Sequence, residues 1–339
     1  MGSVKDLIVL REPQDDSAGV GRFIFSDRYS VFDWGEMPDH IVEKGKATCI
    51  MAAYFFEKLE KSGIMTHYLG IVEDEKARRL DELKEPEDIM EFRLLKVIKP
   101  GIQGDTYDYS AYRKTRGNFL IPLEIIYRNS LPEGSSVFKR LKEGSLRLED
   151  IGLKDIPHEG QVLDKPILDV STKLEVTDRY TTWDEAKEIS NLSDDEIDEI
   201  KSVTLQIDDL ITNEAKKIGL FNEDGKVEFG FDAERNLMLV DTPGTLDECR
   251  FTYDNLPVSK EVARIYYRKT GWYKDVEFAK NQDRLNWKRS VKSSPPPLPE
   301  ELADSIALMY QACANELTGR RWFDAPPIKE VLNTIRSLI

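Results

Sequence analysis

Three charged side chains alternate along residues 224–228 in a pattern that suits phosphate chemistry. Asp224, Lys226 and Glu228 stand two residues apart, so in a β-strand all three project from one face. A face with two carboxylates and an ammonium group can hold Mg²⁺ and a polyphosphate, because Mg²⁺ takes hard oxygen ligands and substrate phosphates. A hairpin with an exposed charged face would give the same pattern, and these residues alone favour that interpretation.

A second polar group follows another predicted strand. Arg128 lies at the end of residues 118–129, and after a short loop the sequence Gly-Ser-Ser occupies 134–136. A guanidinium, hydroxyls and exposed backbone N–H groups can converge there on one anion. The alternative makes Arg128 a surface residue and the serine segment an ordinary turn, and Arg128 alone favours that alternative.

The first half of the chain is predicted to be mostly strands with one helix. Residues 46–62 lack Gly and Pro, repeat their apolar positions at a helical period and stop at Gly63, a favourable residue after a helix. Short apolar runs bounded by turn residues predict half-buried strands at 4–10, 21–27, 91–100 and 118–129.

Pro122 interrupts the last of these strands. A proline inside a strand predicts a sheet edge or a crossover. We therefore expect a hinge at 118–122 and two lobes, with residues 1–121 in the first and 122–339 in the second.

The second half contains more helix. Ser193 and Glu196 form a capping-box pattern ahead of apolar residues that recur at helical spacing up to Gly219. A helical hairpin is predicted to close the chain, with helices over 299–317 and 326–339.

Composition excludes several classes of protein. The 339 residues carry a formal charge of −15, which argues against nucleic acid or an anionic membrane as the partner, because phosphate backbones require a basic face. Three widely separated cysteines without metal-ligand spacing favour a reduced, cytoplasmic location over a disulfide framework or a zinc site. No apolar run is long enough for a signal peptide or a membrane span.

Several short blocks follow one another in fixed order along residues 1–290. They are SDRYSVFD (26–33), EKGKA (43–47), PLEIIYRN (122–129) with Gly-Ser-Ser (134–136), PILDVSTKLEVTD (166–178), GKVEFG (225–230) and VDTPGTLDECRF (240–251). Together they resemble the phosphoribosylaminoimidazole-succinocarboxamide synthase (SAICAR synthetase) family, the ATP-dependent ligases of purine biosynthesis.

The resemblance implies an α+β fold with two lobes, in which a β-rich N-terminal lobe covers ATP and a larger C-terminal domain binds metal and ribonucleotide. It also implies a reaction. ATP phosphorylates the carboxylate of 4-carboxy-5-aminoimidazole ribonucleotide, and the amine of L-aspartate then displaces phosphate from the acyl phosphate to form an amide. The family's members are often homo-oligomers.

The resemblance also assigns site residues. Arg128, Ser135, Asp247 and Arg250 would bind the ribonucleotide, whose 5′-phosphate the two arginines clamp. ATP would contact Lys5, backbone groups near Leu120, Glu124 and Glu228, while Glu228 and Asp241 would hold Mg²⁺. The remaining assignments are catalytic roles for Lys173, Asp178, Asp224 and Lys226, and substrate contacts for Ser30, Asp33, Lys44 and Arg264.

The chain departs from the family's pattern at three positions, which hold Ser3, Thr177 and Thr242. These departures keep a non-catalytic nucleotide-binding relative open as an alternative. A small-molecule kinase on the same two-lobed platform is the other alternative, although a kinase needs neither the STK…D block nor a ribonucleotide clamp. No Walker-type or kinase-type motif is present.

Overall fold

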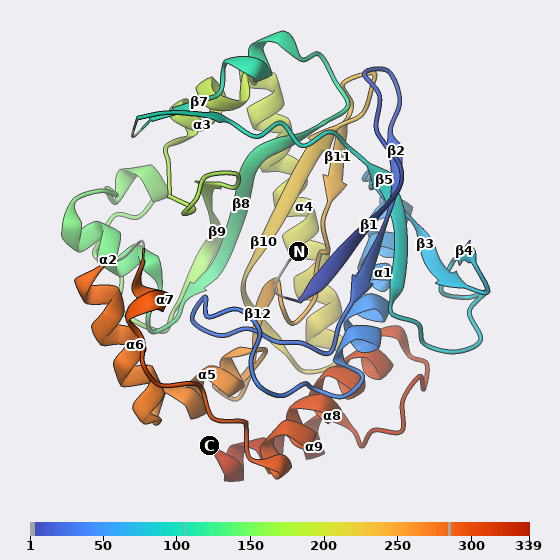
Figure 1. The fold of residues 1–339 in the computed structure, drawn as a ribbon, viewed down its shortest axis with the longest axis vertical. Helices are drawn as coiled ribbons and strands as arrows, with labels where there is room; N and C mark the ends of the chain where they lie inside the picture. Colours follow the sequence, from blue (N-terminus) through green and yellow to red (C-terminus); the bar gives the residue numbers. More distant parts are fainter. Residues whose placement is uncertain (1–3, 105, 284–285) are drawn as a thin grey trace.

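A computed structural model describes residues 4–104, 106–283 and 286–339, and within these ranges the strands form two main sheets (Figure 1). The first sheet has the order β1-β2-β5-β3-β4 with antiparallel pairing throughout. Predicted strands at the N-terminus are confirmed, although β5 ends six residues before the predicted end at residue 100. Its strands are β1 (Lys5–Arg11), β2 (Gly19–Phe25), β3 (Tyr68–Glu73), β4 (Lys76–Arg78) and β5 (Ile89–Leu94).

The second sheet has the order β13-β12-β10-β8-β9, with β11 paired to β10. A separate two-stranded ribbon joins the two short strands that precede β8. The strands are β6 (Gly101–Gln103), β7 (Thr106–Asp108), β8 (Phe119–Leu131), β9 (Gln161–Thr172), β10 (Phe221–Phe231), β11 (Leu237–Val240), β12 (Cys249–Tyr253) and β13 (Leu256–Val258).

The predicted interruption at Pro122 is wrong, because β8 runs unbroken through it and lies between β9 and β10. Pro122 faces the register shift between Glu228 and Gly230 of β10, where the ladder is locally disrupted and a missing N–H leaves no partner unpaired. Its carbonyl accepts a hydrogen bond from the Lys173 N–H at 3.1 Å.

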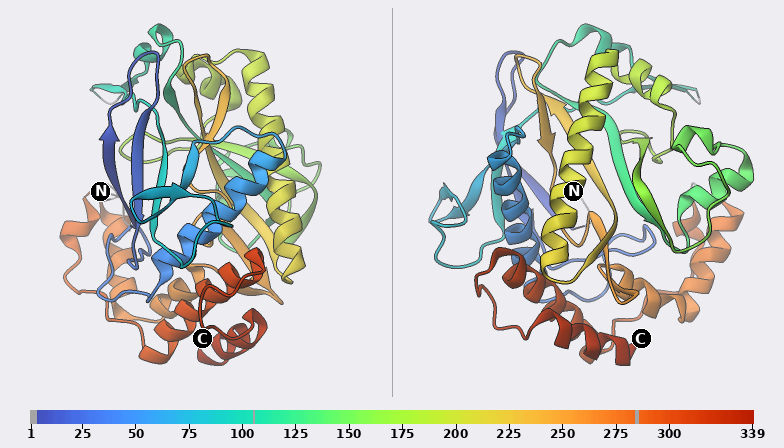
Figure 2. Two further views of the ribbon diagram at one scale, coloured as in Figure 1. Left: turned by 90° about the vertical axis from the view of Figure 1, so that its right-hand side faces the viewer. Right: turned by 180° about the vertical axis from the view of Figure 1, so that it is seen from behind.

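Two long helices lie behind the sheets, α1 (Lys44–Lys61) against the first and α4 (Asp194–Lys217) against the second (Figure 2). Both were predicted. The capping box of Ser193 and Glu196 is present in α4, and Gly63 and Gly219 take left-handed φ values of 90° and 81° after the two helices. These residues can therefore end a helix where other residues would be strained.

The predicted C-terminal hairpin is also present, and its first helix packs against α1. Among the described residues, no helix is both long and apolar enough to cross a membrane. The remaining helices are α2 (Ser136–Glu143), α3 (Trp183–Ser190), α5 (Glu261–Arg268), α6 (Gly271–Gln282), α7 (Trp287–Ser290), α8 (Glu300–Thr318) and α9 (Ile328–Leu338), and short 3₁₀ turns occupy Ser110–Lys114 and Glu149–Ile151.

Backbone contacts tie the two sheets together beside β11. Leu239 of β11 forms a parallel bridge with Thr66, which precedes β3, and its N–H donates to the Met65 carbonyl at 2.9 Å. A second bridge joins Lys96, which follows β5, to Phe119 at the start of β8. These two bridges join the first sheet to the second. Lys5 of β1, in the first sheet, also donates to Asp241, so β1 lies close to the charged residues of the second sheet.

Candidate active site

Carboxylates from neighbouring strands meet in the second sheet. Glu124 of β8 lies directly across from Glu228 of β10, and Glu228 pairs in turn with Val240, the last residue of β11. Directly opposed residues share one face of a sheet, so the two glutamates stand side by side. Asp241 follows Val240 with a left-handed φ of 64°.

Lys226 is the centre of the cluster's ion pairs. Its Nζ lies 2.7 Å from Glu124 Oε1 and 3.5 Å from both Glu228 Oε1 and Glu248 Oε2. Burial would lower the pKa of Lys226, but the carboxylates around it, led by Glu248, raise that pKa instead. The ammonium group therefore stays charged beside its acidic neighbours.

Two further lysines join the cluster from different elements. Lys173, which follows β9, donates to Glu228, and Lys5 of β1 donates to Asp241. Burial would raise the pKa of Asp241, but Lys5 and Lys173 hold it well below its usual range. Burial and the Asp241 charge raise the pKa of Glu228. A bound cation would stabilise both carboxylates in their ionised forms.

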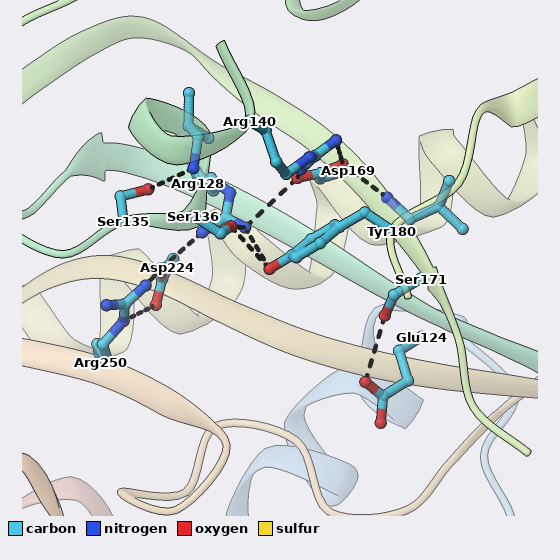
Figure 3. Close-up of polar contacts among 12 residues, drawn as sticks. Glu124, Arg128, Ser135, Ser136, Arg140, Asp169, Ser171, Tyr180, Asp224 and Arg250 are labelled. Atoms are coloured by element: carbon cyan, nitrogen blue, oxygen red, sulfur yellow. Dashed lines mark hydrogen bonds and ion pairs between the residues drawn. The ribbon is translucent and has the colours of Figure 1, made fainter. Parts of the chain in front are cut away.

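The guanidinium groups of Arg128 and Arg250 lie beside Asp224 of β10 (Figure 3). Arg128 of β8 is buried, and its Nη1 lies 3.3 Å from Asp224 Oδ2. Arg250 of β12 donates from Nε to Asp224 Oδ1 at 2.7 Å and contacts the other carboxylate oxygen through Nη2. Asp224 thus lies between the two arginines, apart from the lysine cluster.

A third arginine supports this group. Arg140 of α2 binds Asp169 of β9 through both Nη atoms, and Asp169 Oδ2 lies 3.4 Å from Arg128 Nη2. Asp169 is 4% exposed, and a buried carboxylate requires such partners. The two carboxylates and three guanidiniums fix one another's positions before any ligand binds.

The two serines after β8 have different partners. Ser135 caps α2, since its Oγ accepts from the Val137 N–H at 3.4 Å. A cap side chain turns toward its own helix, and Arg128 Nη2 instead donates to Ser136 Oγ at 3.2 Å. Ser136 therefore contacts the clamp directly, and substrate binding by Ser135 stays a prediction.

One cavity of about 300 Å³ extends from the arginines to Lys226, Glu124 and Glu248 of the lysine cluster. Asp178 and Arg264, both predicted site residues, contribute to its wall. Partial removal from water, with the neighbouring Glu124 charge, raises the pKa of Asp178 to about 6. The site residues along the wall are Glu124, Arg128, Ser171, Asp178, Tyr180, Asp224, Lys226, Asp247, Glu248, Arg250, Lys260 and Arg264.

Lys44 forms an ion pair with Asp247, which lines this cavity. Lys44 Nζ lies 2.6 Å from Asp247 Oδ2, and the Tyr310 hydroxyl donates to Asp247 Oδ1 at 2.8 Å. Burial would raise the pKa of Asp247, but Lys44 and Lys260 lower it. Lys44 itself is 2% exposed, so it acts on the cavity through Asp247.

The structure does not bring Ser30 or Asp33 to the cavity wall. Asp33 has a φ of 60° and is exposed, and its carboxylate lies 3.4 Å from Lys280 Nζ of α6. The preceding Phe32 packs against Tyr273, with ring centroids 4.5 Å apart, which holds this turn on α6. The two predicted substrate contacts thus lie outside the group that the cavity unites.

Leu120 belongs to a small apolar cluster with Leu95, Met238 and Val240, next to the lysine cluster. Its N–H donates to the Lys96 carbonyl at 2.8 Å, so that group is already engaged. Ser3, one of the three departures from the family's pattern, lies outside the described residues.

Sequence reasoning missed Arg140, Asp169, Tyr180, Glu248 and Lys260. Asp169 carried a usable signal, because a carboxylate inside the apolar run at 167–170 predicts a buried cationic partner. Tyr180 and Arg140 carried none, since their positions depend on how α2 and the segment after β9 pack.

The SAICAR synthetase family model matches residues 2–277. A putative phosphoribosylaminoimidazole-succinocarboxamide synthase of Archaeoglobus fulgidus is 53% identical over 339 residues, which cover 100% of both chains. The synthase of Thermoplasma acidophilum is 35% identical over 331 residues, covering 95% of this chain and 98% of the relative.

Solved structures agree with this assignment at the level of fold. SAICAR synthase from Saccharomyces cerevisiae, complexed with SAICAR, has a TM-score of 0.63 at 22% identity and covers 95% of this chain and 94% of its own. A SAICAR synthetase in complex with ADP has a TM-score of 0.55 at 22% identity, covering 88% and 99%. The two-lobed α+β fold is confirmed, and the chain belongs to the SAICAR synthetase family.

Proposed function

We propose that this chain joins L-aspartate to 4-carboxy-5-aminoimidazole ribonucleotide at the expense of ATP. Family membership supports the reaction, and the observation that carries it is a single cavity lined by the arginine clamp and by Lys226 with the carboxylates of Glu124 and Glu248. A ribonucleotide with a phosphate at one end and a carboxylate at the other needs both groups at once.

The clamp would take the 5′-phosphate. Arg128 and Arg250 present planar donor forks, which match phosphate oxygens better than a lysine does. Asp224 contacts both arginines, so we assign it to holding them in place. Lys44, through Asp247, and Arg264 would contact the rest of the ribonucleotide, while Ser30 and Asp33 stay predictions for the floor of the site.

ATP would lie across the lysine cluster, with adenine against the apolar group at Leu120 and with Glu124 nearby. Lys5, Lys173 and Lys226 would contact phosphate oxygens. The donor set fits Mg²⁺, because this ion is commonly held by one or two carboxylates together with substrate phosphates. Glu228 and Asp241 would supply those carboxylates, and Mg²⁺ would neutralise charge on the transferred phosphoryl group. The described residues contain no group of three or more His, Cys, Asp or Glu side chains placed to hold a metal.

The reaction has two bond exchanges. An oxygen of the ribonucleotide carboxylate bonds to the γ-phosphorus as ADP leaves, and the lysines stabilise the charge that develops. The aspartate nitrogen then bonds to the acyl carbon, and the C–O bond to phosphate breaks. Asp178, which lines the cavity and has a raised pKa of about 6, would accept the proton that the amine must lose.

The oligomeric state, the location and the lobe boundary are part of the same proposal. We infer a homo-oligomeric cytoplasmic enzyme whose lobes divide near residues 121 and 122, close to where β8 begins.

The test is ADP release with Mg²⁺-ATP and the ribonucleotide, measured with and without L-aspartate, alongside detection of the succinocarboxamide. Aspartate-dependent release that matches product is the expected result. ADP release that does not depend on aspartate would contradict the ligase and indicate a small-molecule kinase. Nucleotide binding without turnover would indicate a non-catalytic relative.

A further inference from the structure

Tyr180 lies on the cavity wall beside the arginines, in the segment between β9 and α3 (Figure 3). Its hydroxyl oxygen is 3.1 Å from Arg128 Nη2 and 2.9 Å from Ser136 Oγ, and both groups donate to it. Among the described residues, this hydroxyl accepts two hydrogen bonds and donates none. A hydroxyl that accepts hydrogen bonds has a more polarised O–H bond. The Tyr180 proton is therefore available to a ligand that brings an acceptor.

The ring is held in place before that acceptor arrives. The Arg140 guanidinium carbon lies 4.0 Å from the ring centroid, within cation–π range, and Asp169 fixes this guanidinium from its other side. The Tyr180 backbone bridges to Ser171 of β9. Since its position is already fixed, Tyr180 loses little conformational freedom on binding a ligand.

We propose that Tyr180 is a specificity-determining residue, whose hydroxyl donates to a phosphate oxygen bound by Arg128. This inference rests on the proposed function, because it identifies the anion as the 5′-phosphate of the ribonucleotide. A phosphate offers acceptor oxygens to both groups. An unphosphorylated ribose would offer no acceptor to the Tyr180 hydroxyl or to the buried Arg128 guanidinium, which is 2% exposed, so it would bind poorly.

The test compares ribose 5-phosphate binding by the full chain and its variants, measured by isothermal titration calorimetry. Tyr180→Phe keeps the ring and its contact with Arg140 but removes the hydroxyl. We expect ribose 5-phosphate to bind about 10- to 100-fold more weakly, the range for one hydrogen bond to a charged group. Binding of Mg²⁺-ATP should be unchanged.

Tyr107→Phe is the matched control, because the Tyr107 hydroxyl accepts from the Val176 N–H at 2.9 Å in the same segment but lies away from the arginines. This variant should bind ribose 5-phosphate as the unaltered chain does. Arg128→Ala gives the reference loss for the clamp.

Undiminished ribose 5-phosphate binding by Tyr180→Phe would overturn the proposal, as would an equal loss in Tyr107→Phe or a wild-type chain that does not bind ribose 5-phosphate. The measurement needs no catalysis. A chain that binds ribose 5-phosphate through Tyr180 but forms no succinocarboxamide would therefore refute the ligase and leave this inference standing.

Discussion

Replacement of Arg250 by methionine tests whether the arginine group binds the ribonucleotide phosphate. Three guanidiniums, those of Arg128, Arg140 and Arg250, face the carboxylates of Asp169 and Asp224. The group therefore carries one net positive charge, and Arg250→Met reduces it to zero. Methionine keeps much of the apolar stem, so the change removes mainly the charge and the hydrogen-bonding fork.

The size of the effect follows from the exposure of Arg250. A hydrogen bond to a charged group contributes about 1.5–3 kcal/mol, and the Arg250 side chain is 34% exposed, which places its contribution at the lower end. A loss of about 2 kcal/mol corresponds to a roughly 30-fold rise in the KM for the ribonucleotide. The KM of Arg250→Lys for the ribonucleotide should lie between those of the unaltered chain and Arg250→Met, because lysine keeps the charge and loses the planar hydrogen-bonding fork.

Steady-state kinetics with each substrate varied in turn measures this effect, with the KM for ATP as the internal comparison. Arg235→Met is the matched control, since Arg235 pairs with Glu196 at 2.6 Å and neither residue lines the cavity. Equal rises in the KM for ATP and for the ribonucleotide would refute the assignment, and so would a KM that does not change.

Other predictions concern the lysine–carboxylate cluster. Asp241→Asn should abolish Mg²⁺-dependent ADP release while the melting temperature shows a folded chain; full activity at saturating Mg²⁺ would remove Asp241 from the site. The pKa of Asp178, raised to about 6, predicts that kcat falls as the pH drops below about 6, because the protonated carboxyl cannot accept the amine proton. The residual kcat of Asp178→Asn should not fall in this way at low pH. If the fall in kcat is retained, another group causes it. Lys5→Met removes an ion pair to Asp241 and a phosphate contact, so the KM for ATP should rise about tenfold, the effect of about 1.4 kcal/mol, while that for the ribonucleotide stays constant.

Much of this arrangement follows from local sequence. Strand alternation predicts that Lys226 and Glu228 share one face of a strand, and the two side chains do form an ion pair. The capping box of Ser193 and Glu196 predicts the start of α4. Both signals act over a few residues, where backbone geometry alone determines which side chains share a face or end a helix.

Long-range register determines the remainder. Asp169 meets Arg128 because Ile126 of β8 lies opposite Asp169 of β9, and a shift of one residue would turn Asp169 to the other face. No local pattern specifies that register. The choice of Ser136 over Ser135 likewise depends on where α2 begins, and sequence patterns predict helix ends less reliably than the helix itself.

The spacing along β10 gives the site its dimensions. Asp224, which pairs with the arginines, and Glu228, which pairs with the lysines, stand four residues apart in one strand. A strand rises about 3.3 Å per residue, so the two ends of the site are about 13 Å apart. Because β8 and β12 fix Asp224 by pairing, this distance belongs to the sheet and not to a mobile loop. The sheet is therefore suited to an elongated substrate with an anionic group at each end, such as the proposed ribonucleotide with its distal carboxylate.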